Sequence, residues 1–133
     1  MDHEDYFQDY CNRQPQYKSR VERQIGNLLA DRQIPFIYEK PTAVMDDGKL
    51  KIWYPDFSLQ AGLLVEYFGI NGEQDYIQRT RHKLRVYQAN QLDTIPLYPS
   101  DIIPNWQGRL IDRISSALES RLRALRQPQP CWH

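Results

Sequence analysis

YPDFSLQAGLLVEYFG, residues 54–69, is the stretch on which the fold of this chain depends. Two runs rich in strand-forming residues, 49–59 and 63–68, lie on either side of the segment Q60-A61-G62. A connection of two or three residues is the size found in β-hairpins. The stretch therefore predicts two neighbouring antiparallel strands.

A carboxylate interrupts each of these apolar strands, Asp56 in the first and Glu66 in the second. If a short hairpin joins the strands, the two acids can face each other about 5 Å apart. Removing a carboxylate from water costs several kcal/mol, and a bound cation offsets that cost. The pair therefore suggests an oxygen-liganded Mg²⁺ site, although a single acid on a strand is more often exposed or salt-bridged.

Together with the segments on either side of residues 54–69, the sequence predicts one α/β domain with the order αβββαβα, a mixed sheet flanked by helices. The first helix begins with Ser19 and Glu22, the spacing of a capping box. D46-D47-G48 predicts a turn, so that a strand at 34–40 pairs with the strand at 49–59. We expect helices at 19–32, 75–90 and 106–125, and strands at 34–40, 49–59, 63–68 and 94–98.

The length of 133 residues suits a single domain, which we expect at 19–126 between an N-terminal arm (1–18) and a C-terminal tail (127–133). Hydrophobic residues make up 41% and charged residues 26%, which is typical of a folded soluble protein. No apolar run is long enough to span a bilayer, and the acidic N-terminus is unlike a signal peptide. We therefore expect an intracellular, cytoplasmic protein with no membrane contact.

Charge is divided unevenly along the chain, although the formal net charge is zero. Residues 1–75 carry 8 basic and 13 acidic groups, whereas residues 76–133 carry 9 basic and 4 acidic groups. A basic half favours an anionic partner such as nucleic acid. A chance division between solvated faces is the alternative.

Together, P55-D56 and the E66-Y67-F68 strand resemble the PD-(D/E)XK, or restriction-endonuclease-like, nuclease superfamily. The similarity covers about residues 19–101. It implies a core of a helix, a β-meander, a helix and a strand. It also implies that Asp56, Glu66 and the main-chain carbonyl of Tyr67 bind Mg²⁺ or Mn²⁺ for hydrolysis of DNA.

The chain departs from this family's motif at Phe68, which stands where the motif has a lysine. Some branches of the superfamily take the basic residue from the following helix, where this chain reads R79-T80-R81-H82-K83-L84-R85. Lys83 is our candidate for that role, and Arg79, one turn earlier, is the substitute. The alternative is an ordinary solvated basic face.

Further roles follow from the same resemblance. Glu22 matches the family's additional acidic residue, although the capping box gives it an equally good structural role. Arg79, Arg81 and Arg85 are expected to contact phosphates, together with the arginines of the last helix. A homodimer or a higher oligomer is expected, and a two-fold dimer would place two active sites on opposite strands, as in resolvase-like, homing or repair nucleases.

Two other readings remain open. In the first, the same fold has lost catalysis and binds nucleic acid or a protein, which the absence of a lysine at residue 68 favours. In the second, the chain is an ordinary structural domain whose carboxylates form salt bridges.

Overall fold

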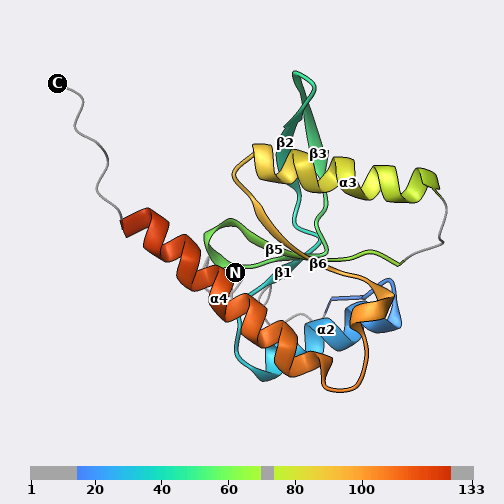
Figure 1. Ribbon diagram of the computed structural model, residues 1–133, viewed down its shortest axis with the longest axis vertical. Coiled ribbons are helices and arrows are strands. Elements are labelled where there is room, and N and C mark those ends of the chain that lie inside the picture. Colours follow the sequence, from blue (N-terminus) through green and yellow to red (C-terminus); the bar gives the residue numbers. More distant parts are fainter. Residues whose placement is uncertain (1–14, 70–73, 127–133) are drawn as a thin grey trace, which may run out of the picture.

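The computed structural model describes residues 15–69 and 74–126, and it is a mixed α/β structure (Figure 1). The expected arm at 1–18 falls within it only at residues 15–18, and the expected tail at 127–133 lies outside it. The helices are α2 (Arg20–Asp31), α3 (Gln74–Ala89) and α4 (Trp106–Arg126). The strands are β1 (Ile37–Tyr38), β2 (Thr42–Asp46), β3 (Lys49–Trp53), β4 (Phe57–Ser58), β5 (Leu63–Tyr67) and β6 (Asp93–Leu97).

Four of these strands form one mixed sheet in the order β1-β4-β5-β6. The pairs β1–β4 and β4–β5 are antiparallel, and β5–β6 is parallel. Helix α3 makes the crossover between the two parallel strands, as such a connection requires. The expected α/β class, the three helices and the antiparallel pairing across residues 60–62 are confirmed.

The expected pairing of 34–40 with 49–59 is found only between Ile37–Tyr38 and Phe57–Ser58, and the expected hairpin between these strands through the turn at 46–48 is wrong. Strand β2 pairs with β3 in a separate two-stranded hairpin whose turn, Asp47-Gly48, has positive φ at both residues. The run 49–59 is two strands, because proline at residue 55 has no N–H to donate to a ladder. Strand β1 pairs with β4, the second of these two strands, with Tyr38 opposite Phe57.

The main sheet is covered on both faces (Figure 1). On one face, buried side chains of β4, β5 and β6 pack against α2 and α4. On the other face, Leu64 packs against Val44 of the hairpin and against Val86 and Tyr87 of α3. The hairpin and α3 therefore form one layer, opposite α2 and α4. The larger core cluster consists of Ile25, Leu29, Phe57, Leu63, Val65, Ile95, Leu97, Trp106, Leu110 and Ile114.

The apolar stripe expected along α4 is buried only in its first half. Leu110 and Ile114 are in the core, but Leu122 is 46% exposed and Leu125 is 74% exposed. Figure 1 shows the reason, since the end of α4 runs past the edge of the sheet. Within the described residues, no helix is long and apolar enough to cross a membrane.

Candidate active site

Asp56 and Glu66 face each other at the end of the β4–β5 ladder. The backbone pairs are Ser58 with Leu64 and Phe57 with Val65, and one further step in this register sets Asp56 opposite Glu66. The Asp56 N–H donates to Glu66 Oε1 at 2.8 Å. The Tyr67 N–H donates to Asp56 Oδ2, also at 2.8 Å. Each carboxylate is therefore fixed by a backbone N–H of the neighbouring strand.

Both acids are held in an environment that opposes their ionisation. The Glu66 side chain is 2% exposed, and Asp56 is half-buried. Burial, together with the nearby Glu66 carboxylate, raises the pKa of Asp56 to about 7. Burial also raises the pKa of Glu66, against the opposing effect of Lys83. Two like charges, one buried and one half-buried, on neighbouring strands create a site where a cation would be stabilised.

Lys83 lies beside this pair. Its Nζ is 3.0 Å from Glu66 Oε2, and it lies 5.9 Å from the ring centre of Phe68. The side chain comes from the third turn of α3, whereas Phe68 is buried at the end of β5 and stacks on Tyr98. The Phe68 ring and the Lys83 ammonium group therefore lie close to each other.

Glu22 is buried in the first turn of α2, and both of its carboxylate oxygens have partners. The Ser19 hydroxyl donates to Oε2 at 2.6 Å and accepts the Glu22 N–H at 3.1 Å. The Tyr38 hydroxyl donates to Oε1 at 2.7 Å. The Ser19 cap is confirmed. Tyr38 is a partner that the sequence did not reveal, because it lies on a distant strand.

Glu22 is nevertheless close enough to repel the other two acids, and its charge contributes to the raised pKa values of Asp56 and Glu66. Across residues 15–69 and 74–126, no three His, Cys, Asp or Glu side chains gather closely enough to hold one metal ion. A metal at this place would have the two strand carboxylates as its side-chain ligands. The neighbouring main-chain carbonyl of Tyr67 would be a third oxygen donor.

These donors fit a hard divalent cation. Mg²⁺ is bound in proteins by one or two carboxylates and usually keeps several waters. Mn²⁺ accepts the same ligands. The buried, mutually repelling Asp56 and Glu66 provide this donor set.

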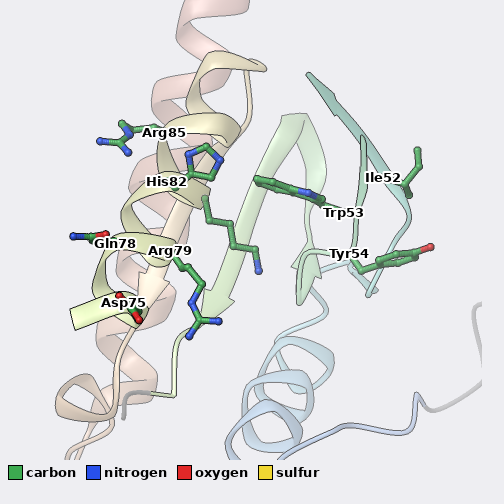
Figure 2. Close-up of a pocket in the computed structure, with 9 residues that line it drawn as sticks. Ile52, Trp53, Tyr54, Asp75, Gln78, Arg79, His82 and Arg85 are labelled. Atoms are coloured by element: carbon green, nitrogen blue, oxygen red, sulfur yellow. The ribbon is translucent and has the colours of Figure 1, made fainter. Parts of the chain in front are cut away.

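An open cleft of about 960 Å³ lies between the β2–β3 hairpin and α3. It reaches the acids through Lys83, which pairs with Glu66, but Asp56 and Glu66 themselves are not among the described residues that line it. Residues 52–54 form one wall (Figure 2). From α3, Arg79 and His82 face the hairpin, whereas Arg85 lies at the rim and points away from it (Figure 2). Lys83 also lines the cleft, but Arg81 does not.

The arginines of α4, which sequence reasoning grouped with those of α3, do not line this cleft, because α4 covers the other face of the sheet. Several of these α4 arginines instead contact carbonyl or carboxylate groups of the same chain. Arg113 donates to the Pro96 carbonyl, Arg121 to the carbonyls of Ala61 and Gln91, and Arg123 pairs with Glu119.

The hairpin is fixed to α3 by polar contacts at two points. Asp46 lies 3.0 Å from His82 Nε2 and 2.8 Å from Lys51 Nζ. Asn90 accepts the Met45 N–H at 2.8 Å and donates to the Met45 carbonyl at 3.0 Å. These contacts hold the two walls of the cleft together.

No protein-family model matches the chain, and no curated protein is significantly similar to it.

Proposed function

We propose that this chain is a Mg²⁺- or Mn²⁺-dependent endonuclease that hydrolyses DNA phosphodiester bonds. The observation that carries the proposal is the buried Asp56–Glu66 pair, with Lys83 3.0 Å from Glu66. Two acids and a lysine beside an open, partly basic cleft suit hydrolysis of an anionic backbone. On this proposal the chain is a member of the PD-(D/E)XK superfamily whose lysine has moved to α3.

Each residue then has a defined role. Asp56, Glu66 and the Tyr67 carbonyl would hold the cation, which when bound polarises the scissile phosphate and lowers the pKa of a water. Lys83 orients the attacking water and neutralises charge that develops on the phosphate oxygens. Arg79 positions the backbone without reading the base sequence.

Glu22 acts on the other acids through its charge. Both of its carboxylate oxygens already accept hydroxyl groups, from Ser19 and Tyr38. Its negative charge raises the pKa of Asp56 and Glu66. Protons therefore compete with a cation for these two carboxylates, and the cation is favoured only when the pH is high enough. We therefore assign Glu22 to tuning the site.

A homodimer forms part of the same proposal. One site of this size cuts one strand, so cleavage of both strands of a duplex requires a second site, which a two-fold partner supplies. Light scattering coupled to size-exclusion chromatography measures the mass in solution. A mass of one chain of 15.9 kDa would contradict the dimer.

A second candidate function is a catalytically inactive module that binds nucleic acid or a protein. One observation favours it: Glu66 is already paired with Lys83 and with the Asp56 N–H. This partial compensation of the buried charge requires no metal.

A cleavage panel distinguishes the two functions. Linear, nicked and four-way-junction DNA are incubated with Mg²⁺, Mn²⁺ or EDTA, using the wild-type protein, Asp56→Asn and Asp112→Asn. Asp112 is an exposed acid on α4 and serves as the matched control. We expect metal-dependent cleavage by the wild type and Asp112→Asn, with at least a hundredfold loss in Asp56→Asn. Cleavage that survives Asp56→Asn unchanged would contradict the metal site, and DNA binding without any cleavage would favour the inactive module.

A further inference from the structure

The two walls of the cleft differ in chemistry. The α3 wall is polar and carries Arg79 and Lys83, with Asp75 as the one acid among the described residues of the lining. The opposite wall is Ile52, Trp53 and Tyr54, an aliphatic side chain followed by two aromatic ones. An occupant must therefore be anionic along one side and flat and apolar along the other.

The aromatic wall has a packed side and an open side. Figure 2 shows Trp53 pointing toward α3, with Ile52 and Tyr54 turned to the other side of the hairpin. Trp53 is half-buried and packs edge-on against Tyr87, with 5.4 Å between the ring centres. Tyr54 is 56% exposed and Ile52 is 51% exposed. Trp53 therefore supports the wall from inside the cleft, while Tyr54 lines the outer edge of the cleft and turns an exposed ring to the far side of the hairpin.

Tyr54 is also held close to the acids. It directly precedes the buried Pro55, and a residue before proline is restricted to an extended backbone. Asp56 follows two positions later, which in an extended chain is about 7 Å away. The backbone of Tyr54 is therefore held about one nucleotide along the chain from Asp56.

Single-stranded nucleic acid has the required combination of features. Its phosphates are anionic, and its unstacked bases offer flat faces to aromatic side chains. In a duplex the base faces are covered by neighbouring pairs, so a ring such as Tyr54 has access only to edges and backbone. Exposed apolar side chains gathered beside a cleft are typical of binding surfaces.

We propose that the cleft binds an unpaired stretch of nucleic acid, with its phosphates against Arg79 and one base stacked on Tyr54. The preferred substrate then has single-stranded character next to the scissile phosphate, as in flaps, forks and loops. This inference rests on the proposed function in one respect, namely that the ligand is nucleic acid. It does not require that the chain cleaves it.

Fluorescence anisotropy in EDTA tests the binding mode. The ligands are labelled single strands of DNA and RNA with one sequence, and the corresponding duplexes. The protein is the full chain as wild type, Tyr54→Ala, Tyr54→Phe and Ile103→Ala. Ile103 is 51% exposed and does not line the cleft, so it controls for loss of a surface apolar group.

Stacking of one base contributes about 1–3 kcal/mol, which corresponds to about 5- to 150-fold in affinity. We expect Tyr54→Ala to weaken single-strand binding at least fivefold and duplex binding less than twofold. Tyr54→Phe keeps the ring and should stay within twofold of the wild type, as should Ile103→Ala. Arg79→Met should weaken single-strand binding and reduce its salt dependence by about one counterion. Equal affinity of wild type and Tyr54→Ala for single strands would overturn the proposal.

A cleavage arm separates this inference from the proposed function. Forked and fully paired substrates are incubated with Mn²⁺. Binding of single strands that depends on Tyr54, with no cleavage, would support the inference and contradict the nuclease. Metal-dependent cleavage of duplex that is unchanged in Tyr54→Ala would support the nuclease and overturn the inference. The DNA and RNA arms identify which sugar the cleft accepts, and failure to bind either would overturn the inference.

Discussion

Lys83 and Glu66 form an ion pair between α3 and β5, with 3.0 Å between Nζ and Oε2. The acid is 2% exposed, whereas the lysine is 38% exposed and lines the cleft. Glu66 is therefore the structural member of the pair, and Lys83 reaches the space where a substrate would lie. This arrangement gives the lysine two roles that a variant series can separate.

Replacement of Lys83 by methionine should reduce cleavage far more than binding. The variant keeps the length of the aliphatic chain but removes the cation beside the proposed water and phosphate. Loss of one such stabilising group reduces kcat by about 10²- to 10³-fold. We expect less than a fivefold change in the Kd for nucleic acid in EDTA. Single-turnover cleavage and anisotropy measure the two quantities.

The matched control for Lys83 is Arg81→Met, which removes a cation from α3 outside the cleft lining. It should keep kcat within about threefold of the wild type. Lys83→Arg restores the charge and keeps the pairing with Glu66, so it should retain the fold even if activity is reduced. If Lys83→Met kept full activity, the catalytic role would belong to Arg79 or to a residue outside α3.

Asp56 should make the metal-free protein less stable as the pH rises. Burial and the Glu66 charge raise its pKa to about 7 in the folded protein, from an ordinary value near 4 in the unfolded chain. Between these values the folded state binds more protons than the unfolded state, so the free energy of unfolding falls as the pH increases. Asp56→Asn removes this titration and keeps an acceptor for the Tyr67 N–H.

We therefore expect Asp56→Asn to be more stable than the wild type at pH 8 in EDTA, by on the order of 1–2 kcal/mol. At pH 4 the difference should vanish. Urea unfolding at both pH values measures it, and added Mg²⁺ should stabilise the wild type but not the variant. If the free energy of unfolding of the two proteins had the same pH dependence, the pKa of Asp56 would not be raised on folding.

Glu22 should shift the pH at which the site binds metal. Its charge raises the pKa of Asp56 and Glu66, so Glu22→Gln should allow both to ionise at lower pH. We expect the midpoint of Mn²⁺ binding, followed by calorimetry from pH 5 to 8.5, to move downward by a few tenths of a pH unit or more. Ser19→Ala removes the helix cap but keeps the charge, so it should cost about 1 kcal/mol of stability without moving the midpoint. Identical shifts in both variants would make the effect structural.

A contact at this site could be predicted from the sequence where the residues it joins are close together along the chain. The Asp56–Glu66 pairing was readable because only residues 60–62 separate two apolar strands. The contact between Tyr38 and Glu22 was not, because it joins a strand to a helix through the tertiary fold. The cleft was missed for a related reason. The run 49–59 reads as one strand, and only the break at residue 55 lets the hairpin leave the sheet and pack on α3.

Asp46 should control the integrity of this cleft. Its hydrogen bond to Lys51, with a further contribution from His82, holds its pKa below the ordinary value. The stability that Asp46 contributes is thus present above about pH 4 and is lost as the pH falls through the lowered pKa. Asp46→Asn should destabilise the protein at pH 7 and have no effect near pH 2. Because Asp46 bridges β2, β3 and α3, the variant should also quicken amide exchange in the hairpin, while the β5 amides stay protected. Unchanged exchange in residues 42–53 would mean that Asn90 and the packing of Val44 and Trp53 on α3 hold the hairpin without Asp46.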